Sequence, residues 1–325
     1  MNDSHNTSLE LDEFSLIEKY FKNQKLSRPD VLLGIGDDAA LVKVPFNHLL
    51  VLSMDTLVNE IHFPAQTLPF DIGYKALAVN LSDLAAMGAE PAWITLALTL
   101  PEANTKWLTE FANGLYQLAN EFNVQLIGGD TTRGSLAVTI QAHGFVPPNQ
   151  SLRRDGAKVG DKIYVSGTLG DAGLGLRVAL HHYELPNQDK CFVLQRLNKP
   201  TPRIQLGILL RNLATSAIDI SDGLLADLNH ILKRSQVGAN IIVKNIPLSK
   251  ALLSLPLEEA QALALTAGDD YELCFTIPPE KEHELISRLK HLQLNCCCIG
   301  EIEKKPGLRI SGFSGILANL GFRHF

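Results

Sequence analysis

The amino-acid sequence predicts an α/β protein built from two α+β domains, and three observations lead to this prediction. The chain has 325 residues, of which 46% are hydrophobic and 20% charged, so it can bury a sizeable core and is long enough for two domains. Apolar β-like runs alternate with helical patterns in both halves of the chain. Between the halves, the segment FVPPNQSLRRDGAKVGD (145–161) concentrates proline, glycine and charge, a composition typical of a domain junction.

The first half begins with an amphipathic segment, EFSLIEKYF (13–21), followed by four β-like runs and two helical patterns. The β-like runs span residues 49–58, 92–100, 125–128 and 136–146. The helical patterns span residues 71–87 and 105–122. We therefore expect an N-terminal domain, residues 1–147, in which helices pack on a four-stranded sheet.

The second half resumes with a strand-like segment, KIYVSG (162–167). Further strands are expected at residues 240–243, 272–277, 296–301 and 308–310. Helical patterns span residues 172–182, 202–213, 223–234 and 279–292. This half is predicted to form a C-terminal α/β domain, residues 148–325, with a mixed sheet and helices.

Composition and charge disfavour several classes of protein. A net charge of −6 without a long basic run argues against a nucleic-acid-binding surface. No apolar run reaches the roughly 18 residues that a membrane span needs, and the N-terminal segment lacks the features of a signal peptide, so we expect a cytoplasmic protein. The five cysteines have no C-x-x-C spacing, which indicates neither a disulfide framework nor a zinc site and favours buried free thiols.

Aspartates recur beside glycine or serine at the ends of apolar runs. They stand in GIGDDAAL, VLSMDTLV, NLSDLAAMG, LIGGDTTRG, AIDISDGLLADL and AGDDYELCF, at Asp37, Asp38, Asp55, Asp83, Asp130, Asp219, Asp222, Asp269 and Asp270. In open α/β sheets the strand ends and the following helix starts form the ligand crevice, so acids placed there can converge. Because clustered carboxylates repel one another unless a hard cation neutralises them, this pattern predicts bound magnesium and a phosphate-bearing substrate.

Asp83 allows two interpretations from the residues alone. Ser82 or Asp83 can cap a helix that runs to Met87 and ends at Gly88, because their side chains accept hydrogen bonds from unpaired backbone N–H groups. Alternatively, the carboxylate of Asp83 is a metal ligand in an otherwise small and apolar segment.

Each phosphate-binding motif in the sequence is weak evidence when it is taken alone. GIGDDA lacks the βαβ context of a dinucleotide site, and the sequence contains no P-loop. The glycine-rich VSGTLGDAGLGL (165–176) can cradle a phosphate or can simply form a tight turn. Arg133, Arg153 and Arg154 have the chemistry to pair with phosphate oxygens, although loop arginines are usually solvated.

Taken together and in order, the motifs GIGDDAAL, KALAVNLSDLAAMGAEPAW, LIGGDTTRG, AIDISDGLLADL and GDDYELCFT resemble the thiamine-monophosphate kinase family, in the superfamily of aminoimidazole ribonucleotide synthetase and selenophosphate synthetase. The resemblance extends from EFSLIEKYF to the terminal GFRHF. It implies that Asp83 starts a helix and binds magnesium. It also implies a homodimer, in which the four N-terminal strands of each subunit pair into a barrel.

The resemblance further implies roles for individual residues. Metal contacts are expected at Asp38, Ser53, Met54, Asp55, Asp83, Asp130, Asp219 and Asp222. Nucleotide contacts are expected at Gly129, Asp130, Arg154 and Ser221, and contacts with thiamine phosphate at His62 and Asp269. The sequence departs from the family pattern where Met54 replaces threonine, Asp269 replaces glutamate and Asn319 replaces an aromatic residue. A thioether is a poor ligand for Mg²⁺, so Met54 would contact a metal through its main chain.

The implied activity is that of a phosphotransferase with a phosphate group as acceptor, which converts ATP and thiamine monophosphate to ADP and thiamine diphosphate. We expect direct in-line transfer with Asp-bound Mg²⁺ ions and no general base, because the attacking phosphate oxygen is already ionised near neutral pH. Two alternatives are a non-catalytic dimer that binds nucleotide and magnesium, and another ATP-dependent synthetase of the superfamily. A selenophosphate synthetase would require a reactive cysteine near the N-terminus, but the first cysteine is Cys191.

Overall fold

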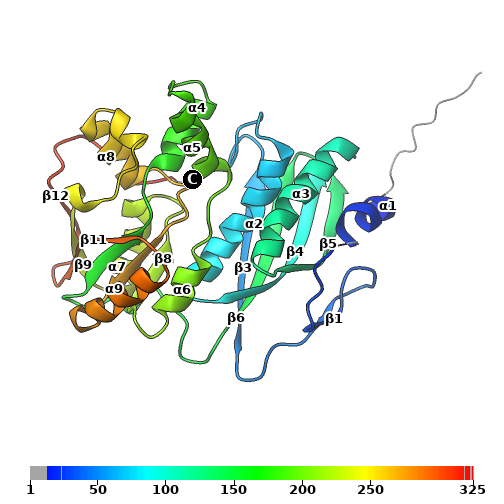
Figure 1. Cartoon of the computed structure of the whole chain (residues 1–325), viewed down its shortest axis with the longest axis horizontal. Helices are drawn as coiled ribbons and strands as arrows, with labels where there is room; N and C mark the ends of the chain where they lie inside the picture. Colours follow the sequence, from blue (N-terminus) through cyan, green and yellow to red (C-terminus); the bar gives the residue numbers. More distant parts are fainter. Residues whose placement is uncertain (1–12, 23, 318, 323, 325) are drawn as a thin grey trace, which may run out of the picture. The chain divides into compact units, whose positions relative to one another are not determined.

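The computed structural model describes residues 13–22, 24–317, 319–322 and 324 (Figure 1). The chain divides into two compact units, each assembled from separate stretches. The first unit consists of residues 1–45, 54–77 and 92–142. The second unit consists of residues 46–53, 78–91 and 143–325. The expected division of the chain between residues 147 and 148 stays a prediction.

A four-stranded sheet contains the four runs that the sequence predicts. Its strand order is β3 (Leu49–Val58), β6 (Ala137–Val146), β4 (Glu90–Leu100) and β5 (Gln125–Arg133). β4 and β5 are parallel, and β5 continues past the predicted end at residue 128 because its pairing with β4 extends to Arg133. A smaller sheet of β1 (Val31–Leu33) and β2 (Leu41–Val42) was not expected, and the N-terminal amphipathic segment forms α1 (Glu13–Ile17) and the π-helix η1 (Glu18–Lys22).

Two helices of the first half, α2 (Pro69–Ala86) and α3 (Thr105–Glu121), lie side by side (Figure 1). Their backbones touch because glycine stands at the contact on both helices: a Cβ atom on Gly73 would lie 2.1 Å from the carbonyl oxygen of Phe111. A Cβ atom on Gly114 would lie 1.9 Å from the carbonyl oxygen of Phe70. Any larger residue at either position would force the helices apart.

The second half of the chain forms a mixed sheet, as predicted, but with six strands rather than the five expected. The strand order is β12 (Gly307–Ser311), β9 (Gly238–Ile242), β11 (Cys296–Glu303), β7 (Lys162–Ser166), β10 (Leu273–Ile277) and β8 (Ser216–Asp219). Only β12 and β9 are a parallel pair among these neighbours. The helices are α4 (Asp171–Ala179), α5 (Asn187–Asn198), α6 (Ile204–Leu210), α7 (Leu224–Ser235), α8 (Leu257–Thr266) and α9 (Glu282–His291). The predictions omitted α5, α8 and β8.

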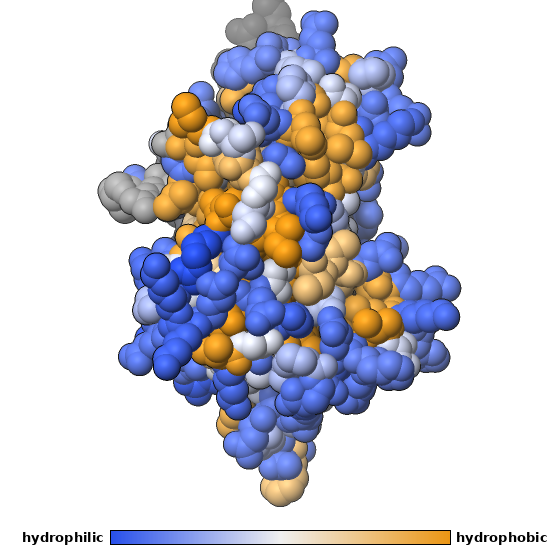
Figure 2. Space-filling view, turned by 90° about the vertical axis from the view of Figure 1, so that its left-hand side faces the viewer, coloured by the Kyte–Doolittle hydropathy of each residue, from blue (hydrophilic) through white to orange (hydrophobic). Residues whose placement is uncertain are grey.

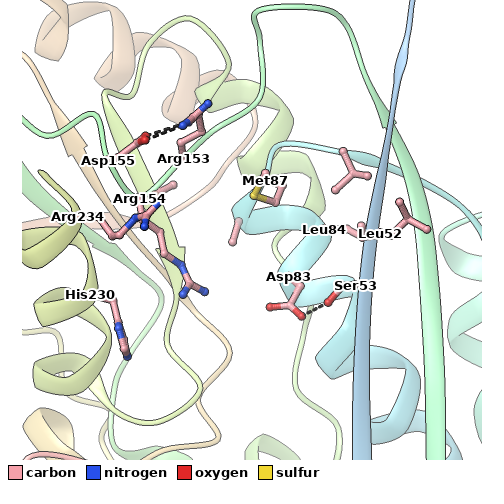
Figure 3. Close-up of a pocket in the computed structure, with 13 residues that line it drawn as sticks. Leu52, Ser53, Asp83, Leu84, Met87, Arg153, Arg154, Asp155, His230 and Arg234 are labelled. Carbon is pink, nitrogen blue, oxygen red and sulfur yellow. Dashed lines mark hydrogen bonds and ion pairs between the residues drawn. The ribbon is translucent and has the colours of Figure 1, made fainter.

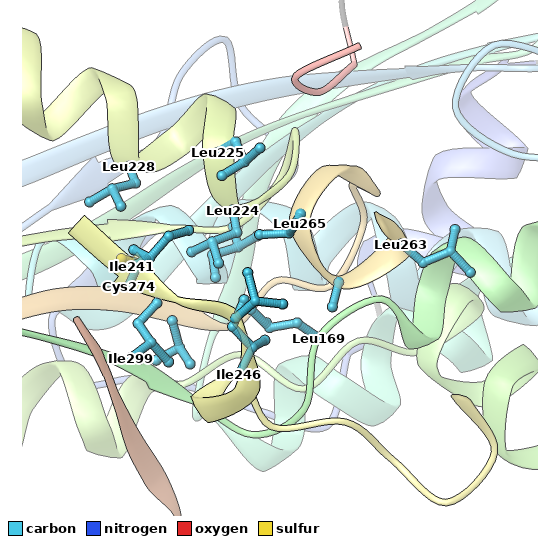
Figure 4. Close-up of a cluster of buried hydrophobic side chains, with 14 of the residues drawn as sticks. Leu169, Leu224, Leu225, Leu228, Ile241, Ile246, Leu263, Leu265, Cys274 and Ile299 are labelled. Carbon is cyan, nitrogen blue, oxygen red and sulfur yellow. The ribbon is translucent and has the colours of Figure 1, made fainter. Parts of the chain in front are cut away.

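The core of the second unit lies around α7 and the strands beside it (Figure 4). Leu224, Leu225 and Leu228 of α7 are buried there together with Ile241 of β9 and Ile299 of β11. This helix is amphipathic, with apolar residues at the spacing of one helical face. Its other face is therefore left to polar side chains, which line a cavity considered below.

One prediction about local structure is wrong. Asp83 does not start a helix, because α2 begins at Pro69 and runs to Ala86, so Ser82 and Asp83 lie in its last turn. Proline suits the first turn of a helix, and the small apolar residues that follow propagate the helix without a break. The expected end at Gly88 is confirmed, since this residue has a left-handed φ of 66°.

The cysteines are free thiols, but they are not all buried as expected. Cys274 is buried in β10, Cys191 is exposed on α5, and the run 296–298 is half-buried. β11 lies between β9 and β7 and is only partly covered on its faces at this end.

Large hydrophobic side chains are exposed on several elements, and Leu253 and Leu257 are among them. Figure 2 shows hydrophobic residues gathered in the upper part of one face of the molecule. On β3, Leu52 is 54% exposed and Met54 is 64% exposed. Within the described residues, no helix combines the length and apolar character needed to cross a bilayer.

Candidate functional site

A cavity of about 600 Å³ lies within the second unit (Figure 3). Its walls come from β3, the last turn of α2, the loop 153–155, β8 and α7. Two of its lining residues, Ser53 and Asp83, are predicted metal contacts, and Arg154 is a predicted nucleotide contact. The fold therefore brings together residues that lie far apart in the sequence.

An acidic wall is formed where the last turn of α2 meets the end of β8. The hydroxyl group of Ser53 donates a hydrogen bond to the carboxylate of Asp83. The neighbouring Ser82 donates to Oδ2 of Asp219 at 2.8 Å, and Asp219 is buried. Burial, and then the charge of Asp83, raises the pKa of Asp219 well above its usual value. Two carboxylates are thus held close enough to repel each other.

The opposite wall is cationic. In Figure 3, Arg154, Arg234 and His230 lie on one side of the cavity, and Ser53 and Asp83 lie on the other. His230 and Arg234 are four residues apart on α7, on the face turned away from the core. Burial, followed by the charge of Arg154, lowers the pKa of His230, so its ring is predominantly neutral at pH 7.

Main-chain hydrogen bonds fix the loop that carries Arg154. The N–H group of Ala217 in β8 donates to the carbonyl oxygen of Arg153 at 3.0 Å. Ser235, at the end of α7, donates to the carbonyl oxygen of Arg154 at 2.9 Å. Arg153 itself pairs with Asp155 at 2.6 Å. The loop is held from both sides, and the side chain of Arg154 is left to face the cavity.

The acidic wall has the chemistry of a magnesium site. Mg²⁺ takes oxygen ligands and usually binds one or two carboxylates, with water and substrate phosphate completing its shell. Asp83 and Asp219 supply such a pair, and a bound cation would relieve their repulsion. Among the described residues, no group of three or more His, Cys, Asp or Glu side chains is gathered to hold a metal by itself. The residues fit a cation shared with a substrate better than a closed structural metal site.

A second cavity, of about 690 Å³, lies within the first unit. It is lined by the loop 34–40 and by β5, and it contains the predicted residues Asp38, Gly129 and Asp130 together with Asp37. Gly129 has a φ of 156°, and a Cβ atom there would lie 1.9 Å from the carbonyl oxygen of Leu96. Only glycine fits so close an approach to β4, which leaves the main chain of β5 open to the cavity.

Asp55, Met54 and His62 complete the predicted set in the first unit. Side chains alternate along β3, so Asp55 and the exposed Met54 point to opposite faces of the strand. The ring of His62 is fixed, because its Nδ1 accepts a hydrogen bond from the N–H group of Val58 at 2.9 Å. Neither cavity described above includes these three residues among its lining.

Main-chain bonds tie the predicted residues Ser221, Asp222 and Asp269 into one framework. The N–H group of Asp269 donates to the carbonyl oxygen of Ser221 at 2.8 Å. The N–H group of Asp222 donates to Asp227 at 3.0 Å. Asp269 adopts a left-handed φ of 68°, a conformation that is costly for a residue other than glycine and needs support from its surroundings. Asn319, the third departure from the family pattern, is exposed.

A buried ionic cluster, which no local sequence motif predicts, follows directly after Asp269 in the chain. Glu272 is fully buried and accepts hydrogen bonds from Arg196 at 2.9 Å and from Nε of Arg203 at 2.6 Å. Asp270 is also buried and accepts bonds from the N–H groups of Gly170 at 2.6 Å and Ala172 at 3.2 Å. No local signal reveals this cluster, because its arginines are about 70 residues away from Glu272 in the sequence.

Comparisons with known proteins cover both halves of the chain. Residues 36–146 match the family described as AIR synthase related protein, N-terminal domain, and residues 158–312 match the corresponding C-terminal domain. The thiamine-monophosphate kinase of Haemophilus influenzae is 48% identical over 322 residues, which cover 97% of this chain and 98% of that protein. The thiamine-monophosphate kinase of Escherichia coli K12 is 51% identical over 293 residues, which cover 89% of this chain and 90% of that protein.

Solved structures show the same likeness. The thiamine-monophosphate kinase from Stenotrophomonas maltophilia K279a has a TM-score of 0.84 at 48% identity, covering 89% of this chain and 93% of that chain. AaThiL complexed with AMPPCP and TMP has a TM-score of 0.77 at 32% identity, covering 90% of this chain and 92% of that chain.

Proposed function

This chain belongs to the AIR synthase related protein family and, within it, to the thiamine-monophosphate kinases; from this premise we propose that it transfers the γ-phosphoryl group of ATP directly to thiamine monophosphate. The complex of a relative with AMPPCP and TMP supports these two substrates, since AMPPCP is an analogue of ATP. The products are ADP and thiamine diphosphate.

One observation carries the mechanism: Asp83 and Arg154 line one cavity, and the charge of Asp83 acts on the buried carboxylate of Asp219. The charge of Arg154 acts on Asp219, which places the two walls within electrostatic range of each other. A phosphate group that carries a divalent cation complements both walls, with its metal toward the acids and its oxygens toward the arginine.

The reaction needs positioning and charge neutralisation more than proton transfer. A phosphate monoester has a second pKa of about 6, so the attacking oxygen of thiamine monophosphate is already ionised at neutral pH. When bound, Mg²⁺ ions neutralise the charge that develops on the transferring phosphoryl group. In this proposal Asp83 and Asp219 hold a cation in the second unit, while Asp38 and Asp130, which share a cavity in the first unit, hold another.

The remaining predicted residues receive supporting roles. Asp55, Ser53, Asp222 and the main chain of Met54 are further metal contacts, Gly129 and Ser221 contact the nucleotide, and His62 and Asp269 orient thiamine phosphate. The fixed ring of His62 suits a positioning role, because its Nδ1 is already engaged with the main chain.

We also propose a homodimer in which a second copy covers β3. Leu49, Leu52 and Met54 expose large apolar side chains on this strand, and exposed apolar strands favour association. Light scattering at micromolar concentration tests this proposal, and a purely monomeric protein would contradict it. The cytoplasmic location likewise stays a prediction.

The activity is tested by ADP release with thiamine monophosphate, thiamine and aminoimidazole precursors as alternative acceptors. Of these three acceptors, we expect only thiamine monophosphate to support ADP release. Asp83→Asn should remove turnover, whereas the matched variant Asp189→Asn should retain it, because Asp189 is also half-buried but lines neither cavity. Binding of ATP and magnesium without turnover on any acceptor would favour the non-catalytic alternative.

A further inference from the structure

We propose that Arg234, at the end of α7, is a second guanidinium group that binds substrate phosphate in the cavity of the second unit. The proposal rests on the proposed kinase function and extends it to a residue outside the predicted site. The ligand chemistry is a phosphate anion with at least two negative charges, from the phosphate chain of ATP or from thiamine monophosphate.

The charge balance of the cavity is the first argument. Its lining contains three arginines, Arg153, Arg154 and Arg234, and two aspartates, Asp83 and Asp155. Arg153 and Asp155 form a close ion pair at 2.6 Å and neutralise each other. Arg234 acts electrostatically on Asp155, whose closer partner is Arg153, and Arg154 acts on the buried Asp219 and Asp227. The three guanidinium groups of the lining nevertheless outnumber its two carboxylates, so the lining carries a net positive charge that favours an anionic ligand.

The placement of Arg234 is the second argument. Leu224, Leu228 and Ile231 of α7 are buried in the core, whereas His230 and Arg234 of the same helix line the cavity. Ser235, the next residue after Arg234, bonds to the carbonyl oxygen of Arg154 at 2.9 Å and accepts from the N–H group of Ala157 at 3.1 Å. The end of α7 and the loop that carries Arg154 are thus joined, which keeps the two guanidinium groups on one wall (Figure 3).

The arrangement matches the geometry of phosphate recognition. A guanidinium group donates two parallel hydrogen bonds to phosphate oxygens, and two such groups can hold different oxygens of one anion. Across the cavity lies Asp83, whose charge acts on the buried Asp219, and in the proposed function these two acids hold a cation. A metal-bound phosphate chain would therefore be held between α2 and α7, with Arg234 at the end farther from the acids.

The test compares Arg234→Gln with Lys233→Gln. Lys233 is exposed in the same turn of α7 and does not line the cavity, so both variants lose one positive charge at the same helix end. Calorimetry with magnesium and inorganic tripolyphosphate measures phosphate binding without an adenine or thiamine group. We expect Arg234→Gln to weaken binding about 10- to 100-fold, as for a lost charged hydrogen bond, and Lys233→Gln to weaken it less than about 3-fold.

A conservative variant and the two substrates sharpen the result. Arg234→Lys keeps the charge but loses the two-pronged geometry, so we expect intermediate affinity. The variant is then titrated with MgATP and with thiamine monophosphate. The ligand whose affinity falls is the one whose phosphate binds Arg234. Equal affinities of Arg234→Gln and Lys233→Gln for all three ligands would overturn the proposal.

This outcome can be distinguished from failure of the kinase function. If the wild-type protein releases no ADP with thiamine monophosphate, the proposed function fails, yet the tripolyphosphate titration still tests Arg234. If the wild-type protein is active and Arg234→Gln matches Lys233→Gln in binding and in the KM of both substrates, only the role of Arg234 is excluded.

Discussion

Glu272 and Asp219 are buried carboxylates of the same unit, but their surroundings differ in one respect. Glu272 is held by two guanidinium groups, those of Arg196 and Arg203, so its negative charge is compensated within the protein. Asp219 accepts a hydrogen bond from the hydroxyl group of Ser82, and the neighbouring charge with the largest effect on its pKa is the like charge of Asp83.

The pKa values of the two groups shift in opposite directions. Burial raises the pKa of Glu272, but the bonds and charges of Arg203 and Arg196 outweigh burial, so the value lies below the usual range. Burial and the charge of Asp83 act together on Asp219 and raise its pKa. A carboxylate held by two arginines supports the fold, whereas two like-charged carboxylates beside a cavity have the chemistry to bind a cation.

The largest effect is expected when the closed cluster is opened. Glu272→Gln removes the buried carboxylate that Arg196 and Arg203 share, which should lower the free energy of unfolding by about 3–5 kcal/mol. Urea unfolding measures this loss. The control Glu301→Gln breaks an exposed pair with Lys162 and should cost about 1 kcal/mol or less. Similar losses in the two variants would show that the cluster around Glu272 adds no special stability.

The second prediction concerns the open pair. Asp219→Asn removes the repulsion with Asp83 but also the proposed cation site, so kcat should fall about 10²-fold or more while the metal-free protein keeps or gains stability. Steady-state ADP release and thermal unfolding without magnesium measure the two effects. A variant that is both less stable and still active would reverse the roles assigned to the two carboxylates.

A smaller effect is expected from magnesium itself. A ligand that binds only the folded state stabilises it by about 2.7 kcal/mol at 100 times its Kd. We expect magnesium to raise the melting temperature of the wild-type protein and to have a much smaller effect on Asp83→Asn. Magnesium should raise the melting temperature of Glu272→Gln as much as that of the wild type, because the cluster around Glu272 has no proposed metal contact. Equal shifts in the wild type and Asp83→Asn would contradict the proposed cation site.

The smallest expected effect is on the pH dependence of stability, and it comes from Asp270, a buried carboxyl group beside the Glu272 cluster. Burial raises the pKa of Asp270 to about 7, although the charge of Arg196 opposes this shift. A raised pKa means that its contribution to stability is fully present below the unfolded value of about 4 and is lost as the pH rises through about 7. Glu272, with a lowered pKa, contributes stability above its unfolded value and loses it as the pH falls.

Between pH 5 and pH 8, therefore, Asp270 rather than Glu272 should contribute to the pH dependence of stability. Measurements at several pH values should show that the free energy of unfolding of Asp270→Asn increases relative to that of the wild type as the pH rises. Because Asn can accept only one of the two N–H bonds of Gly170 and Ala172 well, the variant starts from a lower stability at pH 5. A constant difference across this range would show that Asp270 does not titrate there.

Much of the secondary structure was predictable because it depends on local patterns. The β3 run at 49–58 and the amphipathic α7 follow from side-chain periodicity, and both appear close to the predicted bounds. The role of Asp83 in local structure was predicted wrongly. A serine and an aspartate before an apolar stretch can cap the start of a helix, but they can also lie within a helix that began earlier, as they do in α2. Propagation from Pro69 decided between these alternatives.

The sequence by itself determined the α/β class, the four strands of the first sheet, and the family, because these are carried by periodicity and by motifs of a few adjacent residues. Tertiary structure alone decided that Ser82 reaches Asp219, that Glu272 meets Arg196 and Arg203, and that Arg234 faces the same cavity as Arg154. Each of these contacts joins residues about 70 or more positions apart, so it depends on how strands and helices pack. Burial then sets which carboxylates are compensated and which are left to bind a ligand.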